Sequence, residues 1–284
     1  MPSKPRNKLI RIIPKLDIKN GLLIKGINLE GLRILGHSFD YAESYYKGGA
    51  DEIFYLDNVA SLYGTNNLSK FVKKSASKLF IPLMVGGGIK SLVEIEKMLR
   101  NGADRVSLNS AAINDISIVR DASKEFGSST IVGLIEYTKI QKDYFITKSN
   151  SRDLIKVNPL TWAKKLEDAG CGEIVLTSVN QEGTRQGFDL KMTKIISNTV
   201  KVPVIANGGA GSFEDIYDII NQTKISGVAI ASFFHYNNLL KTDLGKIKIG
   251  NTDFIKKASF NNNKISIIKR LKRFLKQRKI NVNL

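Results

Sequence analysis

The feature that most constrains the fold is a repeat in which short β-branched runs alternate with amphipathic stretches of helical length. Eight runs are expected to form strands: Ile10–Asp17, Glu52–Asp57, Ile81–Val85, Arg105–Asn109, Thr130–Glu136, Glu173–Ser178, Val202–Ala206 and Gly227–Ala231. Among the stretches between them, three predict helices: Leu92–Asn101, Pro159–Ala169 and Phe213–Gln222. Eight successive β/α units predict an α/β fold, a closed eight-fold β/α (TIM) barrel, with an open doubly wound sheet as the alternative.

The two halves of the chain also resemble each other. Four pairs of segments match in the same order, at offsets of 119 to 122 residues: Arg11–Asp17 with Thr130–Glu136, Gly48–Asp57 with Ala169–Ser178, Ile81–Ser91 with Val202–Ser212, and Val106–Ser110 with Val228–Ser232. Barrel strands resemble one another in general, but four ordered matches at nearly one spacing indicate a half-barrel repeated twice.

We expect a single barrel domain over residues 1–284, with half-barrels at about 9–125 and 126–236. A polar insertion at about 237–263 precedes a closing helix at about 264–279. That helix has one apolar stripe, consisting of Ile268, Leu271, Phe274 and Leu275. Binding of this basic helix to a membrane or a partner is the alternative to closing the barrel.

The net charge of +18 is mostly a property of the tail, because residues 241–284 carry 13 Lys and Arg against 2 Asp and Glu. The tail lacks interleaved aromatic residues, so specific nucleic-acid binding is not expected, and an anionic small substrate explains positive charge equally well. The apolar runs are too short to span a membrane, and the start of the chain does not read as a signal or transit peptide.

A single cysteine, Cys171, excludes a disulfide framework and fits a reducing cytoplasm. One cysteine and two histidines do not make a zinc cluster, and no metal or other cofactor is expected. Cys171 precedes the sixth strand, at the end of the barrel away from the expected site, and is expected in the core or at the rim. His37 and His235 are expected to be structural or loop residues.

Glycines follow the third and seventh strands, where the carboxyl ends of barrel strands carry the active site. Gly86, Gly87 and Gly88 follow one, and Gly208 and Gly209 follow the other. Residues without side chains allow a phosphate to approach backbone N–H groups near a helix start. The strands that come next end in Asn109–Ser110 and Ala231–Ser232, which would complete two phosphate sites half a barrel apart. The ligand should then carry a phosphate at each end.

Two carboxylates, Asp17 and Glu136, lie near the ends of the first and fifth strands, between the expected phosphate sites. Facing each other across the barrel mouth, they would form a general acid–base pair; the alternative is that they cap the following loops. Asp57 and Glu182, after the second and sixth strands, are supporting acids.

Two lysines near the first strand have open roles. Lys25 lies in an expected long loop, Asn20–Gly36, where it either closes over a phosphate or is solvated. Lys15 faces the barrel interior by strand parity, two residues before Asp17, and must pair with an acid or lose its proton. Asp17 and Glu136 are both candidate partners.

Four charged residues begin strands at the opposite, amino-terminal end of the barrel: Arg11, Glu52, Arg105 and Glu173. Such residues are usually solvated. If they point inward, two cations and two anions would neutralise one another in a ring that plugs or gates the barrel axis.

These motifs together resemble HisF, the cyclase family of imidazole glycerol phosphate synthase. The resemblance runs from about Arg11 to Tyr236 and rests on IIPKLDIKNG, IPLMVGGGIKS, DRVSLNSAA, GEIVLTSVNQEGT, VPVIANGGAGS and ASFFH. It implies that the barrel takes ammonia from a HisH-like glutaminase subunit docked as a heterodimer on the amino-terminal face. It also implies condensation of that ammonia with a bis-phosphorylated ribulosyl nucleotide, PRFAR, to give imidazole glycerol phosphate and AICAR in histidine biosynthesis. Glutamine hydrolysis needs an activated cysteine with a histidine base, and Cys171 has no nearby histidine in sequence, so a separate glutaminase or free ammonium would supply the ammonia.

The resemblance also implies roles for individual residues. The catalytic carboxylates fall on Asp17 and Glu136, and the loop lysine falls on Lys25. The remaining matches are the phosphate-binding residues Gly87, Gly88, Asn109, Ser110, Gly183, Thr184, Gly208, Gly209, Ala231 and Ser232, and the ammonia gate Arg11, Glu52, Arg105 and Glu173.

Three other functions stay open. The chain departs from the family pattern at Lys15, Glu136 and Glu182, which favours a HisF-like paralogue that passes ammonia to a sugar amidotransferase in surface-polysaccharide synthesis. The chain could instead be a non-catalytic scaffold that activates a glutaminase. A HisA-like sugar isomerase, which also has paired acids and two phosphate sites, is the third.

Overall fold

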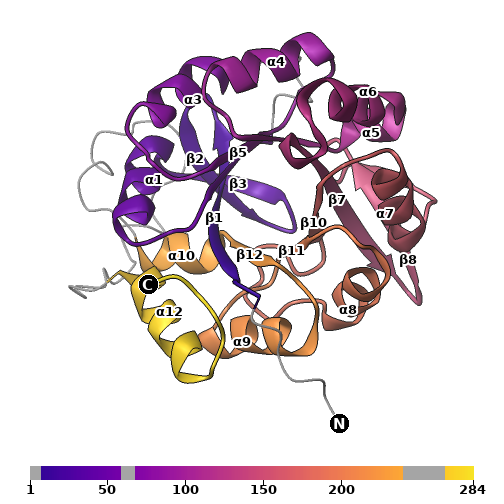
Figure 1. Cartoon of the computed structure of the whole chain (residues 1–284). Coiled ribbons are helices and arrows are strands. Elements are labelled where there is room, and N and C mark those ends of the chain that lie inside the picture. Colours follow the sequence, from indigo (N-terminus) through magenta and orange to yellow (C-terminus); the bar gives the residue numbers. More distant parts are fainter. Residues whose placement is uncertain (1–7, 59–67, 239–265) are drawn as a thin grey trace.

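The protein, described here by a computed structural model, is defined over residues 8–58, 68–238 and 266–284. Eight parallel strands run around a closed ring: β1 (Arg11–Lys19), β4 (Ile53–Asp57), β5 (Leu83–Gly86), β6 (Arg105–Leu108), β7 (Ile131–Ile140), β10 (Glu173–Ser178), β11 (Val204–Asn207) and β12 (Gly227–Ile230). Pairing of β10 with β7 and of β12 with β1 closes the ring (Figure 1). The predicted barrel is confirmed, and the open sheet is wrong.

Helices surround the ring of strands (Figure 1). They are α1 (Ser38–Lys47), α3 (Leu68–Ala76), α4 (Leu92–Arg100), α5 (Ser110–Asn114), α6 (Ser117–Phe126), α7 (Pro159–Asp168), α8 (Leu190–Thr199), α9 (Phe213–Gln222), α10 (Ser232–Asn237) and α12 (Ile267–Gln277), with a 3-10 turn at Ser128–Thr130. Their starts are fixed by local chemistry. The Asn158 side chain caps α7 and is followed by Pro159. Proline suits the first helical position because a backbone N–H there would have no partner within the helix.

The barrel separates two apolar cores. The larger core lies between the sheet and the helices. The smaller one fills the inside of the barrel and consists of Ile13, Phe54, Leu56, Met84, Val132, Leu134, Val175, Ile205 and Ala229. Because side chains alternate along a strand, residues of one parity enter this inner core and those of the other parity face the helices.

The half-barrel repeat is visible in the backbone. Ser91 and Ser212 both cap their helices by accepting a hydrogen bond from the third residue, and both have extended backbone, with φ of −147° and −142°. Asn109 and Ala231 share an unusual conformation, with φ/ψ of −121°/−86° and −110°/−88°. The chain therefore turns from strand to helix in the same way at Asn109 and at Ala231, one in each half of the barrel.

The expected loop Asn20–Gly36 is instead a hairpin, and that prediction was wrong. β2 (Leu22–Ile27) pairs antiparallel with β1 and with β3 (Glu30–His37). The signal was present in Asn20–Gly21, both with positive φ, since Asn-Gly is the strongest short-range hairpin signal. A second hairpin element, β8 (Asp143–Lys148) with β9 (Asp153–Ile155), follows β7.

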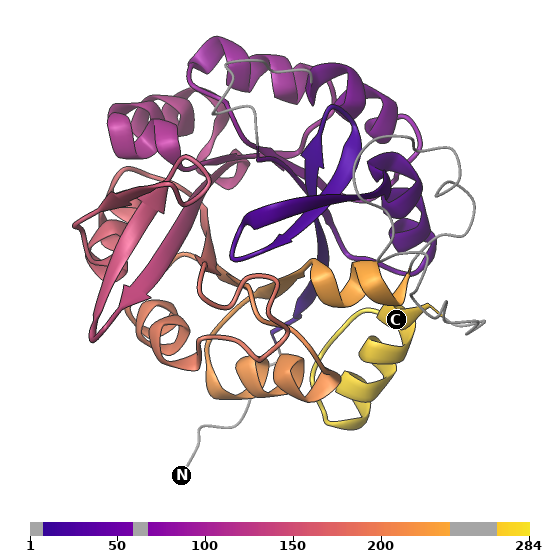
Figure 2. The same cartoon turned by 180° about the vertical axis from the view of Figure 1, so that it is seen from behind.

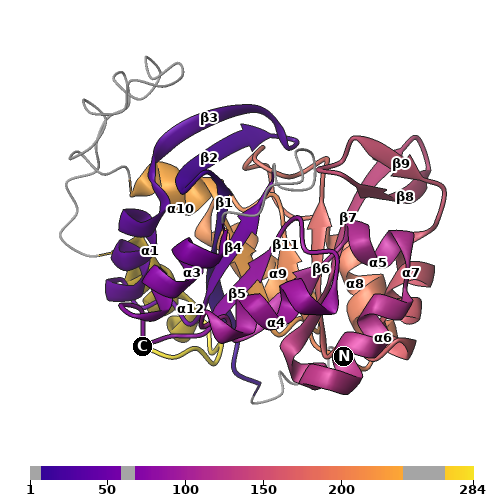
Figure 3. The ribbon, with the colours of Figure 1, turned by 90° about the horizontal axis from the view of Figure 1, so that it is seen from above.

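Both hairpins lie at the carboxyl-terminal end of the barrel. Figure 2 shows β2 and β3 crossing in front of the barrel mouth, and Figure 3 shows both hairpins on one edge of the molecule, with the carboxyl terminus toward the other. The backbone N–H of Asn28 donates to the carbonyl of Glu182 (2.7 Å), which fastens the first hairpin to the loop after β10.

The last helix closes the barrel wall. α12 lies within the segment expected to be helical, and Ile268, Leu271 and Leu275 are fully buried. The polar insertion expected at 237–263 lies, from residue 239 on, outside the described residues. None of the helices that the structure describes has both the length and the apolarity needed to cross a membrane.

Asp51 joins α12 to the first strand. Its carboxylate accepts a hydrogen bond from the backbone N–H of Ile12 (2.7 Å) and from Nζ of Lys272 (2.7 Å). The Lys272 side chain is 3% exposed, so its ammonium depends on this partner.

We expect Asp51→Ala to lower the free energy of unfolding by about 3 kcal/mol, because it leaves a buried ammonium and a strand N–H unpaired. The matched control is Glu96→Ala, which breaks the exposed Arg100–Glu96 pair and should cost about 0.5 kcal/mol or less. Urea denaturation of both variants measures the difference, and equal losses would contradict the role given to Asp51.

Candidate active site

A cavity of about 470 Å³ opens at the carboxyl ends of the strands, as the sequence predicts. Many of the expected site residues line it: Asp57, Gly87, Gly88, Asn109, Ser110 and Glu136. Gly87 has a φ of +97°, and a Cβ there would lie 2.1 Å from the carbonyl oxygen of Asp57. A side chain at this position would therefore collide with the backbone of Asp57, beside the first predicted phosphate site.

The polar groups of this cavity are already oriented. Asn109 donates from Nδ2 to Oε2 of Glu136 (3.1 Å), and Ser110 accepts a hydrogen bond from the backbone N–H of Ser149 (3.1 Å). Asn58, which sequence reasoning missed, also lines the cavity. Its buried Nδ2 has no hydrogen-bond partner among the described residues, so it is a free donor at the cavity wall.

The second predicted phosphate site is a narrow hollow of about 10 Å³ after β11 and β12. Five of its expected residues line it: Gly183, Gly208, Gly209, Ala231 and Ser232. The hydroxyl of Ser232 is buried and has no hydrogen-bond partner in the described part of the chain. A buried donor without a partner favours a ligand that accepts a hydrogen bond.

Two residues at the second site differ from the predictions. Thr184 does not line the hollow, because its hydroxyl turns back to donate to the carbonyl of Gln181 (2.8 Å). Arg185 does line it, with its guanidinium 5.9 Å from the ring of Phe233. Arg185 directly follows the motif GEIVLTSVNQEGT. Its permanent positive charge was the sequence signal that could have identified it as an anion-binding residue.

A chain of buried ion pairs lies beside these sites. Nζ of Lys15 is 2.5 Å from Oδ1 of Asp17. Nζ of Lys25 is 3.2 Å from Oδ2 of Asp17 and 2.5 Å from Oε1 of Glu182. These four side chains are at most 2% exposed. We call the set Lys15, Asp17, Lys25 and Glu182 the ion-pair chain.

The ion-pair chain decides two expectations. Lys15 pairs with Asp17, one of its two candidate partners. Lys25 neither closes over the cavity from a loop nor lies in solvent, so that prediction is corrected. It sits on β2, and because β2 pairs with β1, the hairpin carries the lysine into the barrel interior beside Asp17.

Burial and charge move the pKa values of these groups in opposite directions. Burial acts to raise the pKa of Asp17, but the ammonium groups of Lys15 and Lys25 outweigh it and hold that pKa below its usual range. Burial raises the pKa of Glu136 to about 7, with Lys15 lowering it and Asp17 raising it. Asp17 is therefore a fixed anion, whereas Glu136 exchanges a proton near neutral pH.

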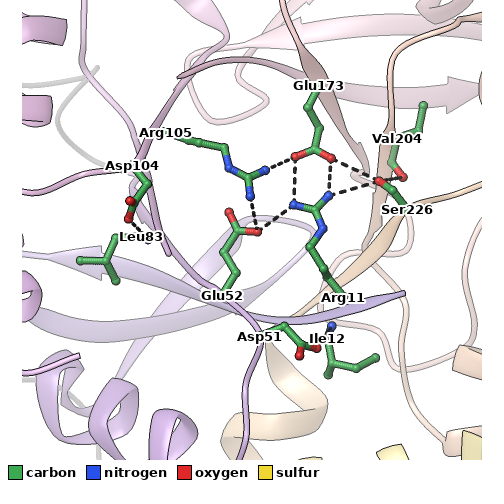
Figure 4. Close-up of polar contacts among 10 residues, drawn as sticks. All are labelled: Arg11, Ile12, Asp51, Glu52, Leu83, Asp104, Arg105, Glu173, Val204 and Ser226. Carbon is green, nitrogen blue, oxygen red and sulfur yellow. Dashed lines mark hydrogen bonds and ion pairs between the residues drawn. The ribbon is translucent and has the colours of Figure 1, made fainter. Parts of the chain in front are cut away.

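The opposite end of the barrel holds the predicted charged ring (Figure 4). Arg11 donates from Nη1 to Glu52 (3.0 Å) and to Glu173 (3.2 Å), with a further bond from Nη2 to Glu173. Arg105 donates to Glu52 (3.2 Å) and to Glu173. All four side chains point inward, so the ring is confirmed, and the reading as solvated rim residues is wrong.

The ring is compact and sits at the floor of the apolar interior. Glu52 is fully buried, and burial raises its pKa to about 7 against the opposing effect of Arg105 and Arg11. The arginine side chains are 20% and 19% exposed, so they separate solvent from the inner core.

The residues considered for glutamine hydrolysis are not arranged for it. Burial raises the pKa of the Cys171 thiol to about 12. His235 is buried, with Nδ1 bonded to the hydroxyl of Tyr45 (2.7 Å), and burial lowers its pKa to about 3. No group of three or more His, Cys, Asp or Glu side chains in the described ranges is placed to hold a metal ion.

Comparison with known proteins adds independent findings. A family model described as "Histidine biosynthesis protein" matches residues 11–240. The chain is 47% identical over 207 residues to "Imidazole glycerol phosphate synthase subunit HisF" of Legionella pneumophila, covering 72% of this chain and 98% of that protein. HisF of Sulfolobus acidocaldarius is 42% identical, covering 83% and 94%, and HisF of Bacillus cereus is 41% identical, covering 80% and 90%.

Glu136 should make stability depend on pH. Its pKa is about 7 in the folded chain against an ordinary value of 4.5, so the stability of the native protein falls as pH rises through this range. The Glu136→Gln variant has no carboxyl group at this position, so it does not lose this stability as pH rises. We expect its stability relative to the native protein to increase by about 3 kcal/mol between pH 4.5 and 8.

Urea denaturation at several pH values measures this dependence. The matched control is Glu125→Gln on the exposed side of α6, for which we expect a pH dependence like that of the native protein. A stability difference between Glu136→Gln and the native protein that stays constant with pH would contradict the assignment.

Proposed function

The chain belongs to the histidine biosynthesis protein family, in its HisF branch, and from this premise we propose which of its groups carry the reaction. Its role is that of the cyclase subunit of imidazole glycerol phosphate synthase, so it is an enzyme. The identities of 39–47% to HisF proteins favour this branch over the HisA-like isomerase.

The substrate we propose is PRFAR, a molecule with a phosphate at each end. One phosphate would bind at Gly87, Gly88, Asn109 and Ser110, and the other at Gly183, Gly208, Gly209, Ala231 and Ser232. The observation that carries this proposal is the matching backbone of the two sites, with Asn109 and Ala231 in one unusual conformation half a barrel apart. Asn58 and Arg185 supply further donors at the first and second site.

Glu136 lies in the cavity wall and suits proton exchange during cyclisation. Imine formation moves two protons from the ammonia nitrogen to the carbonyl oxygen. The first turns the carbonyl oxygen into a hydroxyl as the C–N bond forms, and the second lets that hydroxyl leave as water as the C=N bond forms. Glu136, with a pKa near 7, can accept each proton from nitrogen and pass it to oxygen in turn. Asp17 stays ionised because Lys15 and Lys25 hold its two oxygens, and together with Lys25, Asp57 and Glu182 it orders the site.

Ammonia would enter through the charged ring. The inner core between the ring and the mouth is apolar, which suits neutral NH₃ better than NH₄⁺. We propose a HisH-like glutaminase on the amino-terminal face, forming a heterodimer, with Arg11, Glu52, Arg105 and Glu173 as the gate. The names of the HisF relatives describe them as subunits, which supports a partner chain. The one cysteine of this chain, Cys171, is buried with a raised pKa, which supports a separate source of ammonia. A reducing cytoplasm is the compartment that fits this use of cysteine.

One observation favours a second candidate, the paralogue that passes ammonia on to a sugar amidotransferase. Lys15 neutralises Asp17, which removes one of two carboxyl groups from proton transfer. The purified protein with PRFAR and ammonium salts separates the candidates. We expect imidazole glycerol phosphate and AICAR, detected by chromatography; no product at high ammonium would overturn the cyclase assignment and favour the paralogue or the non-catalytic scaffold.

The second phosphate site gives a sharp prediction. Gly209 has a φ of +110°, and a Cβ there would lie 1.9 Å from the carbonyl oxygen of Gly187. Gly209→Ala should displace this loop and raise the KM for PRFAR about tenfold or more, equivalent to about 1.4 kcal/mol of binding.

The control for Gly209→Ala is Gly127→Ala. Gly127 has a comparable φ of +88°, but a Cβ there meets no atom within 4 Å, and the residue follows α6 away from the cavity. Steady-state kinetics at saturating ammonium compare the two, and an unchanged KM in Gly209→Ala would remove this loop from phosphate binding.

A further inference from the structure

We propose that Lys15 is a positioning residue, whose ammonium fixes Asp17 as a permanent anion so that Glu136 alone exchanges protons with the substrate. The inference rests on the proposed function and assigns different roles to Asp17 and Glu136.

Strand geometry places Lys15 and Asp17 on the same side of β1. Lys15 and Asp17 are two residues apart on β1, so both side chains point into the barrel. Each is 1% exposed, and Nζ of Lys15 lies 2.5 Å from Oδ1 of Asp17. Lys25 donates to the other oxygen, Oδ2, at 3.2 Å. Both oxygens of Asp17 are thus in contact with buried ammonium groups.

Glu136 has a different environment. It forms no ion pair with any described residue. The Asn109 amide donates to its Oε2 (3.1 Å), and the backbone N–H of Ser151 also donates to its carboxyl group. Glu136 lines the large cavity, whereas Asp17 does not. One carboxyl group faces the space for a substrate, and the other faces two lysines.

The charges around both carboxyl groups come from several elements. Asp17 is acted on by Lys15 from β1, Lys25 from β2 and His235 from α10. Glu136 is acted on by Lys15, Asp17 and Glu182. Removing the Lys15 charge therefore has two consequences: the pKa of Asp17 rises because it loses one of its cations, and the pKa of Glu136 rises because Lys15 lowers it.

A carboxyl titration tests the proposal without any substrate. Carbon-13 NMR of protein labelled at Asp and Glu side chains follows each carboxyl with pH, and Asp17→Asn and Glu136→Gln identify the two signals. In the native protein we expect the Glu136 signal to titrate near pH 7 and the Asp17 signal to stay that of a carboxylate down to about pH 4. An Asp17 signal that titrates near neutral pH in the native protein would overturn the proposal by itself.

Lys15→Met removes the charge and keeps an unbranched side chain. We expect its Asp17 signal to titrate at higher pH than in the native protein and its Glu136 midpoint to rise by about one pH unit. The control, Lys164→Met on the exposed side of α7, removes the same charge and should change neither signal. Identical Asp17 titrations in the native protein and in a folded Lys15→Met variant would contradict the proposal.

Kinetics give the second readout. With PRFAR and ammonium, Lys15→Met should lower kcat about tenfold and shift the pH–rate profile to higher pH, with KM for PRFAR unchanged because both phosphate sites are intact. A KM effect with an unchanged pH profile would indicate a merely structural role and contradict the proposal. Absence of turnover in the native protein would instead overturn the proposed function, and the NMR titration would still decide the role of Lys15.

Discussion

Arg11, Lys15 and Asp17 all point from β1 into a closed barrel, and each meets an opposite charge there. Lys15 and Asp17 are almost completely buried, and Arg11, at the amino-terminal end, is partly buried. Arg11 joins Arg105, Glu52 and Glu173 in the ring, and Lys15 and Asp17 join Lys25 and Glu182 in the ion-pair chain. Both sets contain two cations and two anions. Burying an unpaired charge costs several kcal/mol, so this matching is a condition for the barrel to close around them. The apolar inner core lies between the two sets.

The pairing also explains why the candidate chemistry falls where it does. Carboxyl groups in the ion-pair chain pair with lysines, whereas Glu136 accepts hydrogen bonds from uncharged donors, the Asn109 amide and the backbone N–H of Ser151, and has a cavity beside it. The repeat of the half-barrel adds the two loops after β5 and β11, whose glycines let backbone and ligand approach closely. In the proposed function, one repeated unit supplies two anion sites, and a difference between the halves leaves Glu136 as the titrating group between them.

The closed barrel was predictable from sequence, because strand periodicity depends only on local pattern. The four charges at strand starts were recognised, but local pattern left open whether they face solvent or point inward as a ring. The hairpin β2–β3 was not predicted, although Asn20–Gly21 carried the signal for the turn from β1 into β2. Lys25 was misplaced for the same reason, since its burial depends on β2 pairing with β1. The partner of Lys15 was left open between two acids, because strand parity gives the direction of a side chain but not the rotamer that chooses a partner. Arg185 was missed because a single arginine in a loop carries no periodic signal.

The central claim is that two repeated loops hold the ends of one bis-phosphorylated molecule on either side of Glu136. A crystal structure of the protein with a non-reactive PRFAR analogue tests it most directly. The account predicts one phosphate against Gly88 and Ser110, the other against Gly209 and Ser232, and the middle of the analogue within hydrogen-bonding reach of Glu136. An analogue bound with only one phosphate in these loops, or with Glu136 turned away from it, would contradict the account.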